Sequence, residues 1–293
     1  MSEKFQLHVS GLNMLSKCGV QFERAVLNQE RTPPSASMLV GTAVDRAVRR
    51  DLQNKIDAGV LLPEGDVLDT ARDAVNDEWA LGVRLDEEDA EEVGQSKGDA
   101  VDAAVAMSGH HHQKAAPALL PTHVARKWVL DIEGLPIQLA GEIDIQEGLN
   151  AIRDTKTSGK SPNKDAADKS LQLTTYALAV RTLDGQLPGK VALDYVVRTP
   201  KRKDLKLVTL ESARNHHDMS HLAERVYRTA LLMEKGVFTP APIDAWWCSR
   251  KFCPYHGDCR FAARPHSVTV PSLERQLQDS LVQIGRGESN GNQ

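Results

Sequence analysis

The first 120 residues carry hydrophobic side chains at helical spacing. Val44, Val48 and Leu52 recur one turn apart, which predicts a helix over residues 41–58. Two further segments, at about 66–80 and 86–116, are rich in alanine and acidic residues and also favour helix. A shorter helix is predicted over residues 10–28. The amino-terminal part of the chain is therefore expected to be helical.

The pattern changes to alternation between residues 122 and 155. The segments THVARKWVLDIEG, LPIQLAGEIDIQEG and LNAIRDTKT predict three strands joined by tight turns at Gly134 and Gly148. A helix over 166–183, two more strands (VALDYVVRT and LKLVTLE) and a helix over 212–235 follow. This order predicts an α/β fold with a mixed central sheet. It contains no Gly-rich phosphate loop, so ATP binding is not expected.

The composition is that of a protein with a substantial core. Of 293 residues, 41% are hydrophobic, enough for one large domain. We expect one domain over residues 1–265, with a helical insertion at 60–116. The polar segment 266–293 is expected to be a disordered tail.

Charge and hydropathy restrict the setting of the protein. A net charge of −4 argues against nonspecific coating of nucleic acid, although not against a local basic surface. No apolar run reaches the roughly 18 residues of a membrane span, and the first residues lack a signal-peptide pattern. A cytoplasmic location is expected, where disulfides are disfavoured and clustered cysteines are more often metal ligands.

The four cysteines are unevenly placed. Cys18 stands alone, whereas Cys248, Cys253 and Cys259 fall within 12 residues. Four thiolates at one point would form a metal or iron–sulfur site, which requires the two ends of the chain to meet. The tract His110–His112 has no partner spacing and is expected to be a solvated helix end.

Carboxylates and a lysine are predicted to meet at one edge of the sheet. Asp154 and Lys156 are two apart in a strand and share a face, and the turn at Gly148 would bring Asp144 beside Asp154. Carboxylates can hold one or two Mg²⁺ ions, and a lysine there can orient or deprotonate a water. Taken alone, an Asp-x-Lys strand is more often a solvated ion pair.

Three motifs together resemble the PD-(D/E)xK nuclease superfamily, and within it the RecB-type exonucleases. They are G-E-I-D at 141–144, D-T-K-T at 154–157 and Q-x-x-x-Y at 172–176. The resemblance implies a restriction-endonuclease-like core and a catalytic role for Lys156. The remaining site residues that it implies are the metal ligands Asp144, Asp154 and the Thr155 carbonyl, with Gln172 and Tyr176 lining the site.

One position departs from that family. RecB-type nucleases usually carry G-x-x-x-H on an earlier helix, with the histidine as a metal ligand, whereas this chain has Gly41 followed by Asp45. We expect Asp45 to act as a ligand, since hard cations prefer oxygen. The opposite outcome, that the shorter side chain does not reach, stays open. Glu142 faces the same side of its strand as Asp144. It is expected either to approach the site or to face solvent or DNA, and the second is at least as well supported.

The split cysteines also resemble a known arrangement. One cysteine before the nuclease core and three after it are similar to the iron–sulfur clasp of AddB-type nuclease domains and of CRISPR-adaptation nucleases. This implies a [4Fe–4S] cluster, with zinc as the alternative. The four implied ligands are Cys18, Cys248, Cys253 and Cys259.

The resemblance implies a DNA exonuclease that depends on Mg²⁺ or Mn²⁺. It would act on single-stranded DNA or DNA ends in recombination, repair or phage DNA processing. No membrane partner is expected, and a helicase or recombinase is a possible partner. The alternatives are a CRISPR-adaptation nuclease and a DNA-end-binding module with a weak active site. A structure-specific endonuclease is a third.

Overall fold

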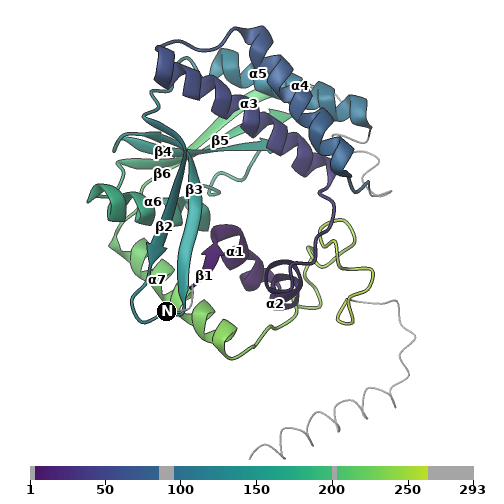
Figure 1. The fold of residues 1–293 in the computed structure, drawn as a ribbon, viewed down its shortest axis with the longest axis vertical. Coiled ribbons are helices and arrows are strands. Elements are labelled where there is room, and N and C mark those ends of the chain that lie inside the picture. The colour runs from purple at the N-terminus through teal and green to yellow at the C-terminus, as the bar shows by residue number, and fades with distance from the viewer. Residues whose placement is uncertain (1–3, 86–95, 200–202, 263–293) are drawn as a thin grey trace, which may run out of the picture.

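A computed structural model describes residues 4–85, 96–199 and 203–262. It has a central sheet with helices on both faces (Figure 1). Part of the predicted helix over 86–116 and the whole segment 266–293 lie outside the described residues.

The chain begins with a short strand that the sequence did not predict. β1 (Phe5–His8) pairs in parallel with a strand more than 100 residues later, a partner that no local pattern reveals. α1 (Val9–Lys17) follows directly. The backbone is then extended at Cys18, whose Sγ accepts a hydrogen bond from the backbone N–H of Gln21 at 3.4 Å.

The predicted single helix over 10–28 is therefore wrong. After Cys18 the chain forms the short helix α2 (Gly19–Phe22) and a π-helical turn (Glu23–Leu27). Cys18 caps α2, because a side-chain acceptor at a helix start satisfies one of the free backbone donors. The break fixes the position of this thiol between two helices.

Three helices form one outer layer. They are α3 (Ala36–Ala58), α4 (Glu64–Leu81) and α5 (Lys97–Lys114). The predicted stripe of Val44, Val48 and Leu52 is buried, and most of its neighbours on α4 and α5 are alanines, which allow close helix packing. α3 begins at the cap Ser35 and ends at Gly59, which has a positive φ of 77°.

The sheet has mixed strand directions, as predicted, and within the described residues it has six strands, one more than predicted because of β1. Its other strands are β2 (His123–Asp131), β3 (Ile137–Glu147), β4 (Ala151–Ser158), β5 (Lys190–Arg198) and β6 (Leu205–Ser212). The order is β1-β3-β4-β5-β6, and β2 pairs with β3. β3 and β4 are paired only over 145–147 and 151–153, beyond which the two strands separate.

The second face of the sheet is covered by α1, α6 (Leu171–Asp184) and α7 (His216–Glu234). Both later helices start at capping side chains, Ser170 and Asn215, a few residues inside the predicted bounds. The result is an α/β fold with a mixed sheet between helices, consistent with the expected restriction-endonuclease-like core. Among the described helices, none is both long and apolar enough to cross a bilayer.

Candidate active site

Two aspartates meet where β3 and β4 separate. Ile145 pairs with Arg153, and the same register continued by one residue sets Asp144 opposite Asp154. The side chain of Asp154 is fully buried and that of Asp144 is 14% exposed. The predicted approach of the two carboxylates across the hairpin agrees with this register.

Burial makes negative charge unfavourable at this pair. It raises the pKa of Asp144 to about 8, and the neighbouring charges of Asp154 and Asp45 add to the shift. Burial also raises the pKa of Asp154, although Lys156 opposes that shift. Two adjacent buried carboxylates keep both charges only when a cation offsets them.

Lys156 is held between β4 and α6. Its Nζ lies 2.7 Å from Asp154 Oδ2 and donates to Asp154 Oδ1 at 3.0 Å and to Gln172 Oε1 at 2.9 Å. Burial opposes the charge of Lys156, but the nearby aspartates outweigh it and raise its pKa. The amine therefore stays protonated while the aspartates are charged.

Gln172 and Tyr176 complete a chain of contacts that begins at Asp154. Gln172 Nε2 donates to Tyr176 Oη at 2.7 Å, as residues one helical turn apart can. Burial raises the pKa of Tyr176, so its phenol is neutral. Trp128 packs edge-on against the Tyr176 ring, with centroids 6.5 Å apart. The structure thus brings together Asp144, Asp154, Lys156, Gln172 and Tyr176.

Asp45 joins this group through an arginine that the sequence did not single out. Arg49, one turn later on α3, has its Nε 2.7 Å from Asp45 Oδ2, bonds Glu142, and has one terminal nitrogen 3.6 Å from Asp144 Oδ1. Only its i+4 spacing from Asp45 could have suggested the pairing. Through Arg49, Glu142 belongs to the edge of the site.

Gly41 lets α3 approach β4 at this point. A Cβ at Gly41 would lie 3.2 Å from Thr157 Oγ1, closer than most such contacts. The glycine of the G-x-x-x-D motif therefore permits this close packing of α3 on β4. It places Asp45, one turn later, at the open edge of β4.

The carboxylates of the site can be compared with the needs of a divalent cation, which binds oxygen donors. Among the described residues, no three His, Cys, Asp or Glu side chains are arranged to hold a metal, and Arg49 lies between Asp45 and Asp144. Yet Asp154 Oδ2 is buried and accepts no well-aligned hydrogen bond, and the pKa values of Asp144 and Asp154 are both raised. Two buried carboxylates whose pKa values stay raised despite Lys156 and Arg49 are hard oxygen donors that suit a hard cation, so the residues fit.

The opposite face of β4 is fixed by a separate ion-pair network. Arg153 lies 2.7 Å from Glu147 and 3.0 Å from Asp194, and Asp194 accepts a hydrogen bond from Thr209 at 2.6 Å. These contacts join β3, β4, β5 and β6. They hold the strand that presents Asp154 and Lys156 on its other side.

The segments that carry the cysteines meet, as predicted. Arg24 makes two 2.9 Å bonds to Asp258, Tyr255 Oη donates to the Glu30 carbonyl at 2.7 Å, and the backbone of Gly19 donates to Thr239 at 2.7 Å. In Figure 1 the yellow-green segment lies beside α2. These contacts join the two segments without any metal.

The four thiols are free and lie near one another. Burial raises the pKa of Cys248, and the proximity of Cys18 and Cys259 adds to the shift. The pKa of Cys253 is also raised by burial, with the other three cysteines contributing. Within the described part of the chain they do not form a preorganised metal group. Four soft donors from two joined segments nevertheless fit a thiolate-bound metal or cluster.

The prediction that His110–His112 form a solvated helix end is wrong. His111 is 1% exposed, and neither of its ring nitrogens has a hydrogen-bond partner. His112 Nδ1 lies 2.8 Å from the buried Asp51 of α3. The last turn of α5 packs inward, a tertiary contact that the polarity of histidine concealed.

Comparisons with known proteins agree with this geometry. A sequence model of the PD-(D/E)XK nuclease superfamily matches residues 6–260. The crystal structure of a Eubacterium rectale protein described as a "putative exonuclease" superposes with a TM-score of 0.53 at 12% identity, covering 92% of each chain. The crystal structure of SSO0001 gives 0.40 at 13% identity over 90% of each chain, too low to support any argument.

No curated protein matches the chain. The likeness to the Eubacterium rectale protein supports the fold alone, since its sequence identity is low. The match to the sequence model covers most of the chain, including β3, β4 and α6 with the contacts among Asp154, Lys156 and Gln172. The chain belongs to the PD-(D/E)XK nuclease superfamily.

Proposed function

We propose that this protein is a metal-dependent DNA exonuclease that hydrolyses phosphodiester bonds in single-stranded DNA or at DNA ends. The observation that carries the proposal is the buried pair Asp144 and Asp154 beside Lys156, with Lys156 fixed by Gln172. Such an arrangement serves phosphodiester hydrolysis by a metal-activated water. The description of the Eubacterium rectale protein as an exonuclease favours this class of activity.

Asp144, Asp154 and the Thr155 carbonyl would hold the Mg²⁺ or Mn²⁺ ion. Asp45 would join them once Arg49 turns away from it. A bound ion would polarise the phosphodiester and lower the pKa of an attacking water. Lys156 would orient that water through its ammonium, and Gln172 and Tyr176 would keep Lys156 in place.

The cysteines are proposed to hold a [4Fe–4S] cluster, with zinc as the alternative. The support is the placement of four thiols on two joined segments, with Cys18 fixed by the break between α1 and α2. The group would tie the amino-terminal helices to the carboxy-terminal segment, so its role would be structural.

The biological setting is proposed from the resemblance alone. It comprises DNA recombination, repair or phage DNA processing in the cytoplasm, with a helicase or recombinase as partner. CRISPR adaptation is the alternative setting.

Digestion of DNA strands labelled at either end tests the proposal. With Mn²⁺ or Mg²⁺, an exonuclease releases single labelled nucleotides early from one end and leaves a circular single strand intact. Cleavage of the circle would instead identify an endonuclease. If wild type and Lys156→Ala are equally inert but both bind DNA, the protein is a DNA-end-binding module.

A further inference from the structure

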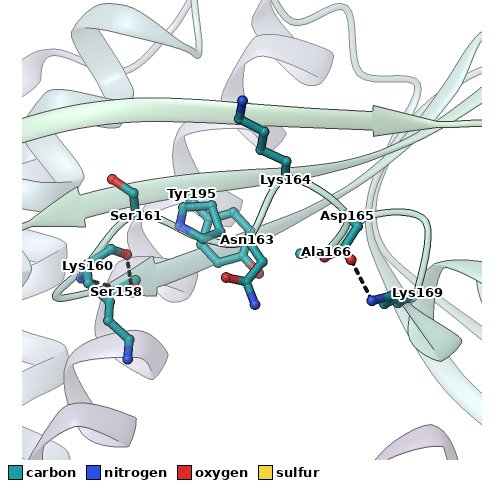
Figure 2. A pocket seen from close by; sticks show the side chains of 10 residues that line it. Ser158, Lys160, Ser161, Asn163, Lys164, Asp165, Ala166, Lys169 and Tyr195 are labelled. Carbon is teal, nitrogen blue, oxygen red and sulfur yellow. Dashed lines mark hydrogen bonds and ion pairs between the residues drawn. The ribbon is translucent and has the colours of Figure 1, made fainter.

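A polar pocket of about 780 Å³ opens between the end of β4 and the loop that leads to α6. It is lined by Ser158, Tyr195 and side chains of the segment 160–169 (Figure 2). Its volume falls within the roughly 300–1,000 Å³ of typical small-ligand sites. No residue of this pocket belongs to the site described above.

The pocket adjoins the active site on the sheet. Ser158 lies two residues after Lys156 on β4, and Tyr195 is the register neighbour of Lys156 on β5. Paired residues on adjacent strands are about 5 Å apart and share a face. A DNA strand with a phosphodiester at Lys156 can therefore continue directly over the pocket.

The charge of the pocket suits a phosphate backbone. Three lysines stand against one aspartate, in a chain whose net charge is −4. Asp165 pairs with Lys169 at 2.5 Å. Lys160 and Lys164 are exposed, and neither ammonium is paired with a carboxylate among residues 4–85, 96–199 and 203–262.

The lysines surround the pocket without converging on one point. Figure 2 shows Tyr195 and Asn163 near the centre, with Lys160, Lys164 and Lys169 around them. This spread suits successive phosphates of a strand better than one isolated phosphate. The partly exposed ring of Tyr195 offers a surface for base stacking.

We propose that this pocket is a subsite for the substrate strand next to the scissile phosphate. Lys160 and Lys164 bind successive backbone phosphates, and the base between them stacks on Tyr195. The inference rests on the proposed function, because it takes DNA as the substrate. It adds the path of the strand and the residues that fix it.

Binding without divalent metal tests the subsite separately from cleavage. A fluorescent single strand of about 12 nucleotides is titrated with the full-length protein in EDTA, at salt from about 50 to 300 mM. Lys160→Ala with Lys164→Ala should reduce the salt slope of log K by about 0.7 for each lysine. At 0.1 M salt this corresponds to about fivefold weaker binding per lysine. The matched control, Lys97→Ala with Lys114→Ala, removes two exposed lysines outside the pocket and should leave the slope unchanged.

The aromatic contact has its own variants. Tyr195→Leu should weaken binding about tenfold, whereas Tyr195→Phe, which keeps the ring, should bind like wild type. Unchanged affinity and slope in the double lysine variant, or a wild type that does not bind the strand, would overturn the subsite. Loss of binding as expected in a protein that never cleaves DNA would contradict only the proposed nuclease activity.

Discussion

Arg49 occupies a position among carboxylates that would suit a metal ion. It contacts Asp45, Glu142 and Asp144 and thereby offsets their charge when no metal is bound. Burial opposes the charge of Arg49, but these partners raise its pKa, so it remains a cation. Arg49 and a divalent ion are therefore expected to compete for the same oxygens.

Arg49→Met should destabilise the protein more in EDTA than in Mn²⁺. Without metal, the variant removes the cation that contacts three carboxyl groups, which should cost about 1–2 kcal/mol for this partly exposed group. A bound ion would replace the lost charge and reduce the difference in stability between the variant and wild type. Thermal unfolding of both proteins in EDTA and in Mn²⁺ measures that difference. Arg46→Met, on the exposed pair with Asp77 and Glu78, is the control. An equal loss in EDTA and Mn²⁺ would contradict the competition.

His111 should make the fold sensitive to acid. Burial lowers its pKa to about 4 from 6.5, so the unfolded chain takes up a proton more readily than the folded one. The contribution of neutral His111 is complete above pH 6.5 and is lost as the pH falls towards 4, by up to about 3 kcal/mol.

Urea unfolding of His111→Leu across that pH range tests this prediction. The variant should gain stability relative to wild type as the pH falls, because leucine cannot take up the proton that favours the unfolded state of the wild type. The exposed His221→Leu should show no such pH-dependent gain. A constant difference between wild type and His111→Leu would contradict the assignment.

At the scale of elements, a glycine and a tryptophan fix the hairpin that carries Asp144. Trp128 lies opposite Gly141 in the register of β2 and β3, and a Cβ at Gly141 would lie 2.6 Å from the indole ring. The same indole supports Tyr176 on α6. Gly141 is therefore required by packing within the G-E-I-D motif.

Gly141→Ala should cost about 1–3 kcal/mol in the free energy of urea unfolding, since the indole must move. Gly65→Ala provides the control, because its Cβ would meet nothing within 4 Å and alanine favours the helix α4. It should be neutral or slightly stabilising. A Gly141→Ala protein as stable as wild type would show that the indole adapts freely.

How far the sequence predicted these elements depends on where their partners lie. The hairpin around Gly148 was predictable, because strand alternation and its turn are local, and it brought Asp144 to Asp154. β1, the break at Cys18 and the burial of His111 depend on contacts far along the chain. The i+4 spacing of Arg49 and Asp45 is local, but the contacts of Arg49 with Glu142 and Asp144 follow only from the placement of α3 against the sheet.

At the scale of the whole molecule, the two ends of the described chain are joined around four cysteines. The joining contacts run from the end of α1, from α2 and from the turn that follows it to the segment 239–258. The ion pair of Arg24 with Asp258 contributes to the contact between the two segments, and the proposed cluster would contribute a second link. The two contributions can be separated by mutation.

Cys18→Ser should abolish the brown colour of anaerobically purified protein and lower its melting temperature. The reason is that a structural metal group adds its binding energy to the folded state. Arg24→Met should keep the colour, because it breaks the Asp258 pair and leaves the thiols intact. A colourless wild type with stoichiometric zinc would contradict the assignment of an iron–sulfur cluster. An unchanged melting temperature in Cys18→Ser would contradict the proposal that the bound group stabilises the fold.

The central claim is that Asp144, Asp154 and Lys156 form a metal-dependent nuclease site. Its most direct test is the rate of Mn²⁺-dependent release of labelled nucleotides by wild type and by Asp154→Asn, a substitution that keeps the shape and removes the charge. Asp102→Asn, on the exposed face of α5, is the matched control. We predict a loss of about a hundredfold or more in Asp154→Asn alone, with its fold retained by circular dichroism. Cleavage at the wild-type rate by Asp154→Asn would contradict the account.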